Sequence, residues 1–555
     1  MRDDKLPGFD WRYDFQMFVE EKGRHFEGAV IAKLGERWPI TRIGSNPAHA
    51  RSLAKEEATR AAIAARAPLI YQAVLWDEKE RTFGMVDLLV RSDVLLQLFP
   101  SAFEGESEAS IFILTPNFPS PLAGDRQGGG YHYRVVDIKF MTLQFGRAGH
   151  TSRYHTAGMV QCWIYNRALG AIQGYTPPFS YLLGRAWLQG DQRGTSCFDR
   201  LARIPQDDET LAGIAGKAVD WIRVLRKLGS GWDLFPPTRP ELYPNMKNAQ
   251  DFPWHHGKKT YAGQIGELTQ LWRVTPRRRR LAHAAGITRL DDPRLTAAVL
   301  GFPDNKQGRT LDAILAANRR PDQPVVLPEK ISGNDGNWRK PWPLELYVDF
   351  ETVSDLADDF SRIPEKGGAP RIFLIGCGHL NQAGNWQFKQ FTAADLSLDA
   401  ERDMIDQWVA HLSSWGLPLS KIRLFHWAPA EESFLDNAYN SARARHPERK
   451  WPELRWFDLL QRLARREPVT VTGALNFGLK SMANAFFKLG KISTAWPDSR
   501  LDGLSAMVGA WRAAGEASER GVPFAETELI RQIGIYNEVD CRVMMEILRY
   551  LRQRH

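Results

Sequence analysis

The stretch Leu346-Tyr347-Val348-Asp349-Phe350-Glu351-Thr352 is an apolar run that carries two carboxylates. In a β-strand alternate side chains share a face, so Asp349 and Glu351 are expected to project in the same direction. Near the end of the chain, Tyr536 and Asp540 are four residues apart in a helical stretch, which places them on one face of a helix. Carboxylates on apolar elements repel each other unless a cation lies between them. The pattern therefore predicts a divalent metal site suited to phosphodiester chemistry.

Size and composition limit the class of protein. The chain has 555 residues, of which 43% are hydrophobic, and a formal net charge of +8. This length predicts about three domains, and the positive charge mildly favours a polyanionic partner such as nucleic acid. From about residue 342 to the end, strand patterns alternate with amphipathic helices, as expected for an α/β fold. The start of the sequence lacks the apolar segment of a signal peptide, and no uncharged apolar run approaches the length of a membrane span. We expect a cytoplasmic protein with no membrane partner.

The four cysteines are far apart and contain no C-x-x-C pair; they are Cys162, Cys197, Cys377 and Cys541. This spacing argues against a zinc ribbon and an iron–sulfur cluster, and disulfides are not expected in a chain of this size.

The sequence of the first part of the chain predicts a helical region followed by a small sheet. Residues 10–66 show a helical period of apolar side chains, 68–75 and 82–90 resemble two strands of a hairpin, and 131–143 predict a third strand. A helix is expected from about 156 to 169.

Three charged residues fall on these strands. Asp87 ends an apolar run, and Asp137 and Lys139 share one face of the third strand. Such charges are costly to bury without ligands. Two acids can hold a metal, while a lysine can polarise the attacking water or the phosphate. By itself, an Asp-x-Lys pair is more often a surface ion pair.

Four elements in order resemble the RecB-like branch of the PD-(D/E)xK nucleases. They are Gly23…Glu27, Gly84…Asp87, Asp137-Ile138-Lys139 and Gln161…Tyr165. The resemblance implies a restriction-endonuclease-like domain in which Asp87, Asp137 and Glu27 hold a metal, Lys139 activates water, and Gln161 and Tyr165 line the substrate path. Many relatives have His at the position of Glu27, and His25 lies nearby but is offset from it. Relatives with an iron–sulfur cluster hold it through clustered cysteines, which this chain lacks.

The C-terminal motifs resemble the DEDD nucleases of the ribonuclease H fold. A fourth acid is expected in Leu424–Leu435, where an apolar strand leads into a helix. The resemblance implies that Asp349, Glu351, Glu431 and Asp540 hold two metals and that Tyr536, which marks the DEDDy type, positions the nucleophilic water. Glu432 is an alternative to Glu431. Asp458 is more simply explained as a structural cap.

The segment between the two constellations resembles a helix-hairpin-helix module at residues 268–300, although Thr275-Pro276 replaces its usual glycines. Arg277, Arg278, Arg279 and Arg280 are candidates for nucleic-acid phosphate contacts, or form a solvated helix face. The predicted domains are 1–245 (RecB-like), 246–335 (connector and small helical module) and 340–555 (ribonuclease-H-like DEDDy). This order resembles a family of RecB-like nucleases with a fused ribonuclease-H-like domain.

Together these observations lead us to expect a nuclease with two metal-dependent sites, acting on DNA rather than RNA and removing 3′ nucleotides at the C-terminal site. All-oxygen ligands favour Mg²⁺ or Mn²⁺. The chain has no G-x-x-x-x-G-K-[ST] phosphate loop, so any unwinding would come from a partner such as a helicase. The alternatives are a catalytically inactive nucleic-acid-binding scaffold and an RNA-processing nuclease.

Overall fold

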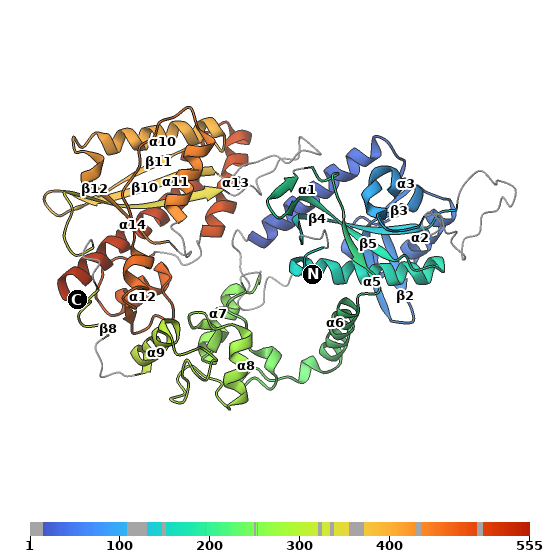
Figure 1. Cartoon of the computed structure of the whole chain (residues 1–555), viewed down its shortest axis with the longest axis horizontal. Helices are drawn as coiled ribbons and strands as arrows, with labels where there is room; N and C mark the ends of the chain where they lie inside the picture. The colour runs from blue at the N-terminus through green and yellow to red at the C-terminus, as the bar shows by residue number, and fades with distance from the viewer. Residues whose placement is uncertain are drawn as a thin grey trace. The chain divides into compact units, whose positions relative to one another are not determined.

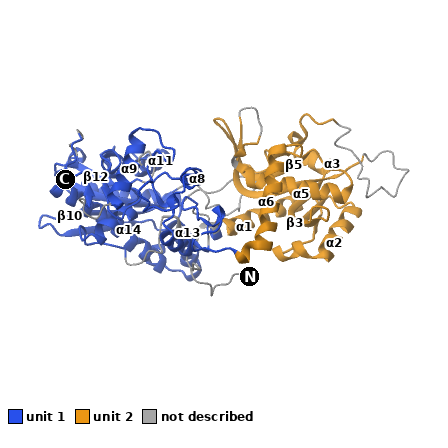
Figure 2. Ribbon diagram, turned by 90° about the horizontal axis from the view of Figure 1, so that it is seen from below, with its two compact units in different colours: residues 1–18, 232–357, 369–555 blue, residues 19–231, 358–368 orange. Residues whose placement is uncertain are grey.

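The computed structural model describes residues 15–107, 130–146, 151–194, 196–248, 251, 253–319, 325–333, 338–353, 371–428, 434–496 and 503–555. Contacts within the chain divide it into two compact units (Figure 2). Unit 2 is built mainly from Val19–Gly231, and unit 1 mainly from Trp232–Ala357 and Ala369–His555. Each unit is an α/β structure around its own mixed sheet.

The sheet of unit 2 has seven strands in the order β1-β2-β3-β4-β5-β6, with β7 also paired to β5. Strands β2, β3 and β4 are antiparallel neighbours, whereas β4 and β5 are parallel. A parallel pair needs a crossover, and helix α5 (Thr156–Gln173) supplies it. The strands are β1 (Ile40–Arg42), β2 (Leu69–Asp77), β3 (Thr82–Arg91), β4 (Tyr133–Phe145), β5 (Phe179–Gln189), β6 (Gln192–Gly194) and β7 (Ala202–Pro205).

Helices cover both faces of this sheet. Ile138 of β4 belongs to the same core as Val30 of α1 (Phe15–Gly35), and α3 (Ser92–Leu98) joins that core. Val135 belongs instead to a core with Leu169 of α5 and with α2 (Leu53–Ala64). Helix α6 (Glu209–Leu228) packs beside α5. Because side chains alternate along a strand, Asp137 and Lys139 lie on the α5 face with Val135.

The predicted strands and the helix after them are confirmed, with differences of a few residues at their ends. The helical character predicted for residues 10–66 is confirmed for most of the range but is wrong for the segment between its two helices. The range contains α1, the short strand β1, a 3₁₀ turn at Pro47–Arg51 and α2. The apolar period of α1 does not reveal that β1 pairs with β2, because that pairing joins residues about thirty positions apart.

The main sheet of unit 1 has five strands in the order β11-β10-β9-β12-β13. Strands β9 (Leu344–Val353), β10 (Arg371–Leu380) and β11 (Trp386–Thr392) form an antiparallel meander. Strands β12 (Ile422–His426) and β13 (Trp456–Asp458) run parallel to β9. The carboxyl ends of β9, β12 and β13 therefore lie at one side of the sheet, which we call the carboxyl edge.

The two faces of this sheet are covered by different helices (Figure 1). The Phe350 ring packs edge-on against Trp408 of α10 (Leu398–Ser413), with centroids 5.5 Å apart. Helix α11 (Phe434–Arg445) contacts β10. On the opposite face, α13 (Gly503–Arg520) contacts β9, and α14 (Glu528–Arg554) contacts β9 and β10. The alternation in Asp349-Phe350-Glu351 therefore directs both acids toward α14.

The segment predicted as a separate helical module shares its core with the C-terminal region. Leu268, Leu271 and Val274 belong to the same hydrophobic cluster as Phe477 and Leu548. The helices of this segment are α7 (His255–Gln264), α8 (Pro276–Ala284) and α9 (Lys306–Arg319). A small sheet also joins the two regions, because β8 (Val326–Leu327) pairs with β14 (Thr470–Val471), just before α12 (Leu479–Lys488).

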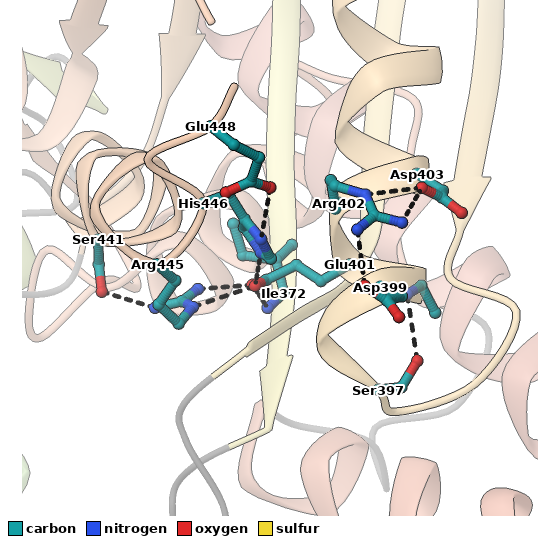
Figure 3. Close-up of polar contacts among 11 residues, drawn as sticks. Ile372, Ser397, Asp399, Glu401, Arg402, Asp403, Ser441, Arg445, His446 and Glu448 are labelled. Carbon is teal, nitrogen blue, oxygen red and sulfur yellow. Dashed lines mark hydrogen bonds and ion pairs between the residues drawn. The ribbon is translucent and has the colours of Figure 1, made fainter. Parts of the chain in front are cut away.

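A buried carboxylate ties α10, α11 and β10 together (Figure 3). Glu401 is fully buried. Its oxygens accept hydrogen bonds from the Ile372 amide at 2.7 Å and from Arg445 at 2.5 and 3.0 Å, and lie 2.9 Å from His446 Nε2. Since Arg445 and His446 lie at the end of α11, this cluster fixes the helix that follows the predicted fourth acidic segment.

Replacing Glu401 by alanine is expected to lower the free energy of unfolding of unit 1 by about 3 kcal/mol, because it leaves a partly buried Arg445 without its carboxylate. Glu448→Ala is the matched control. Glu448 is 56% exposed and lies 3.8 Å from His446, so its removal is expected to cost under about 1 kcal/mol. Urea unfolding of the full chain measures both changes, and equal effects would contradict a stabilising role for the buried cluster.

Candidate active sites

Three of the four predicted C-terminal acids lie together. Carboxylate oxygens of Asp349, Glu351 and Asp540 all lie within 4.8 Å of one another. Glu351 and Asp540 are buried, whereas Asp349 is half-buried. Glu431 and its alternative Glu432 fall in 429–433, outside the described residues.

The electrostatics of this triad favour a cation. Burial and the neighbouring charges of Asp540 and Glu351 raise the pKa of Asp349 well above its usual value. Burial also raises the pKa of Asp540 to about 7, although Lys480 and hydrogen bonds from Tyr536 and Trp496 oppose that rise. A divalent ion between the oxygens would remove this repulsion and displace the protons. The donor set is oxygen only, which suits Mg²⁺ or Mn²⁺.

Tyr536 lies on the same helical face as Asp540 and hydrogen-bonds to it. Burial, together with the three carboxylates, raises the pKa of the Tyr536 phenol, which therefore stays protonated and able to donate. Lys480 Nζ lies 4.5 Å from the centroid of the Tyr536 ring, and Trp496 Nε1 donates to Asp540 Oδ1 at 3.1 Å. Lys480 and Trp496 were not predicted, since neither belongs to a recognisable motif.

Asn537 is a further member that the sequence analysis missed. Its buried Nδ2 donates to Asp349 Oδ2 at 2.8 Å and lies 3.5 Å from Glu351 Oε1. Gly376 stands opposite Asp349 on β10, and a Cβ there would lie 1.7 Å from Asn537 Oδ1. The sequence signal that could have identified Asn537 was its spacing of three residues from Asp540, which places both side chains on one face of the helix.

Asp458 and His426 lie opposite each other at the carboxyl edge. Burial raises the pKa of Asp458 to about 6, and its Oδ1 accepts the Gln461 amide at 2.9 Å. This contact agrees with the predicted capping role. Burial lowers the pKa of His426 to about 3, so this imidazole is neutral.

The predicted N-terminal residues also lie close together. Lys139 Nζ is 2.6 Å from Asp137 Oδ2, and Asp87 Oδ2 accepts the Ile138 amide at 2.8 Å. Burial and the charge of Asp137 raise the pKa of Asp87 well above its usual value, against the lowering effect of Lys139. Burial lowers the pKa of Lys139, but the charges of Asp137 and Asp87 outweigh it and raise the pKa overall. The lysine is therefore a cation beside two clustered acids.

Helix α5 carries the last N-terminal motif, Gln161 and Tyr165, on the face of the sheet where Asp137 and Lys139 lie. Gln161 Nε2 donates to the Tyr165 hydroxyl at 2.9 Å. The Tyr165 ring also explains Gly84, because a Cβ at that position would lie 2.3 Å from Tyr165 Cε1. The glycine of the Gly-x-x-Asp pattern thus provides space for the tyrosine of the Gln-x-x-x-Tyr pattern.

Glu27, rather than His25, faces this cluster. Gln72 Nε2 lies 3.3 Å from Glu27 Oε1 and 3.2 Å from the Tyr71 hydroxyl. Burial and a hydrogen bond to Glu27 raise the pKa of Tyr71. The side chain of His25 is exposed. Gln72 has a φ of 52°, a strained value for a residue with a side chain, at the level of Asp87 in the neighbouring strand.

The predicted arginine cluster divides into exposed and structural residues. Arg277 and Arg280 are exposed on α8. Arg279 is buried, pairs with Glu267 at 3.0 Å and donates to the carbonyls of Tyr243 and Pro244, so it is not available to a phosphate. Arg278 stacks over Phe302 and donates to the Leu300 carbonyl at 3.0 Å. The interpretation of all four as phosphate contacts is therefore corrected, because the side chains of Arg278 and Arg279 make contacts within the protein.

The raised pKa of Asp540 predicts a pH dependence of stability. A carboxyl with a raised folded-state pKa stabilises the metal-free protein fully below its unfolded value near 3.8, and this contribution is lost as pH rises through about 7. The metal-free Tm of unit 1 is therefore expected to fall between about pH 4 and 7. Mn²⁺ should raise Tm more at pH 7.5 than at pH 5, and Asp540→Asn should reduce that difference. Thermal unfolding in EDTA and in Mn²⁺ measures both, and a Mn²⁺ effect independent of pH would contradict the prediction.

None of the helices in the described residues combines the length and apolar character required to cross a lipid bilayer. Comparisons with protein-family models, with curated proteins and with solved structures find no match to this chain.

Proposed function

We propose that this protein is a metal-dependent nuclease with two separate sites that hydrolyse phosphodiester bonds of nucleic acid. The observation that carries the proposal is the cluster of Asp349, Glu351 and Asp540, with oxygens within 4.8 Å and Tyr536 beside them. Three carboxylates this close together are costly to ionise without a cation, and the charges of Asp540 and Glu351 raise the pKa of Asp349 accordingly.

The architecture of unit 1 supports a ribonuclease-H-like assignment. A five-stranded sheet in which the first three strands form an antiparallel meander and the last two run parallel to the first is the arrangement expected of that fold. Asp349 and Glu351 lie on β9, the central strand, and Asp540 lies on α14, in agreement with the strand and the helix predicted for them.

The architecture of unit 2 supports a PD-(D/E)xK assignment in the same way. Apart from β1, α2, α3 and short 3₁₀ turns, the order α1, β2, β3, β4, α5, β5 is a helix, three antiparallel strands, a crossover helix and a parallel strand. Asp87, Asp137 and Lys139 lie on its second and third antiparallel strands.

At the C-terminal site, Asp349, Glu351 and Asp540 would hold Mg²⁺ or Mn²⁺, which when bound polarises phosphoryl oxygens and lowers the pKa of water. The protein's own groups orient this chemistry. Asn537 fixes two of the carboxylates, and the protonated Tyr536 hydroxyl can donate to a water or a phosphate oxygen. Lys480 adds positive charge where negative charge develops on the phosphate.

The test is digestion of end-labelled single- and double-stranded DNA and RNA in Mg²⁺ or Mn²⁺. We expect release of nucleotides from 3′ ends of DNA, and none in EDTA. Cleavage of RNA in preference to DNA would move the assignment to RNA processing. If no substrate is cut while binding persists, the protein is a scaffold and the proposal fails.

A further inference from the structure

A basic cleft lies in unit 1, and none of its lining residues belongs to the Asp349–Glu351–Asp540 cluster. It has a volume of about 440 Å³, and Trp272, Lys306, Thr310, Gln461, Arg465 and Arg466 are among its lining residues. Asn305 and Gln307 complete the lining. Three of these side chains are cations, three carry amides, and the described lining residues include no carboxylate. The nearby Asp304 pairs with Arg309 at 3.1 Å.

The cleft is assembled from three distant parts of the chain. Trp272 precedes α8, Lys306 begins α9, and Gln461, Arg465 and Arg466 belong to the π-helical turn (Leu460–Ala464) and the residues after it. The Trp272 amide donates to the Leu475 carbonyl at 2.9 Å, and its indole meets the Phe477 ring edge-on at 5.5 Å. These contacts fix the aromatic wall.

Hydrogen bonds connect the cleft with the carboxyl edge of the sheet. Gln461, which lines the cleft, donates a hydrogen bond from its backbone N–H to Asp458 Oδ1 at the end of β13. Phe477, which packs on Trp272, accepts a hydrogen bond at 2.9 Å from Nε1 of Trp427, the residue that follows β12. Since β9, β12 and β13 are parallel, these contacts place the cleft near the carboxyl edge of the sheet. Asp349 and Glu351 lie toward the same edge on β9.

We propose that this cleft binds the phosphodiester backbone of a single-stranded nucleic acid whose end is processed at the Asp349–Glu351–Asp540 cluster. The identification of the strand as substrate rests on the proposed function, whereas its binding does not. Cations with neighbouring amides match phosphate oxygens, and an aromatic wall beside them is typical of grooves that accept single strands. Exposed Lys306 and Arg466 are the side chains best placed to meet a phosphate from solvent.

The test measures binding of a fluorescein-labelled oligodeoxythymidylate in EDTA by anisotropy over a range of salt concentrations. Lys306→Ala/Arg466→Ala is compared with the charge-matched control Lys488→Ala/Arg554→Ala, whose parent residues are exposed in unit 1 outside the cleft. Loss of two phosphate contacts is expected to flatten the slope of log Kobs against log[salt] by about 1.4, at about 0.7 per contact. The control should keep the wild-type slope. Thermal unfolding of both variants checks that they remain folded.

Equal slopes for the cleft variant and the control would overturn the proposal. A change seen with duplex DNA and not with the single strand would overturn the single-strand assignment. Because hydrolysis does not occur in EDTA, the result is independent of catalysis. The separate loss of cleavage in Asp349→Asn tests the proposed function, so either idea can fail without the other.

Discussion

Replacing Asp349 by asparagine is expected to lower the rate of nucleotide release from 3′ ends by about 10³-fold. The change removes one charge from the cluster that would hold the metals, and a single electrostatic contact to a developing phosphate charge is worth several kcal/mol. Asn537 donates to Asp349, so the substitution also replaces a charge-assisted hydrogen bond by a contact between amides. End-labelled substrate in single-turnover conditions measures the rate.

Metal binding distinguishes loss of the site from loss of folding. Titration calorimetry with Mn²⁺ should show weaker or absent binding at the C-terminal site of Asp349→Asn, with an unchanged far-ultraviolet circular dichroism spectrum. Lys139→Ala is the control for this measurement, because it alters the other cluster only. Retention of both the wild-type rate and the wild-type Mn²⁺ stoichiometry in Asp349→Asn would exclude the C-terminal metal site.

Lys139→Ala, made in the Asp349→Asn background, is expected to lower the remaining cleavage activity by about 10²–10⁴-fold. The lysine is a cation 2.6 Å from Asp137, and groups positioned to assist proton transfer at the reacting centre typically contribute within that range. The background is needed because it strongly lowers the activity of the C-terminal site, so that the remaining cleavage reports mainly on unit 2.

Lys139→Arg is the matched control for that experiment. It keeps the positive charge beside Asp137 and Asp87, so the metal-free protein should retain its stability. The planar guanidinium cannot occupy the place of an ammonium, so activity should remain low. If Lys139→Ala cuts as fast as its background, Lys139 is only an ion-pair partner of Asp137, which is the simpler interpretation of an Asp-x-Lys pair.

At β9 and α14 the sequence and the structure agree on which side chains share a face. Alternation within Asp349-Phe350-Glu351 predicts that two acids share a face, and a spacing of four predicts that Tyr536 and Asp540 do so. Both are local periodicities fixed by strand and helix geometry, and the structure brings these residues into one cluster. Lys480 and Trp496 were missed because their approach to this cluster depends on how distant segments pack against α14, which no local period records. Asn537 shares a helical face with Asp540, but its hydrogen bond to Asp349 depends on how α14 packs against β9.

The arginine run shows the opposite case. Four consecutive cations on a helix predict a solvated or phosphate-binding face, yet Arg279 points inward to Glu267 and Arg278 stacks on Phe302. A helix turns about 100° per residue, so consecutive residues cannot all face one surface. Which of them turned inward depended on a buried carboxylate twelve residues earlier.

The sequence by itself determined β2, β3, β4 and α5 and the faces on which Asp349, Glu351, Asp137 and Lys139 lie, because those follow from periods of two and 3.6 residues. Only the tertiary structure decided that Glu27 meets Tyr71 and Gln72, that Asn537 joins two carboxylates, and that Trp272, Lys306 and Arg466 line one cleft. These arrangements join residues tens to hundreds of positions apart. Their proximity is set by the packing of whole elements, which minimises exposed apolar surface across the unit rather than within any one segment.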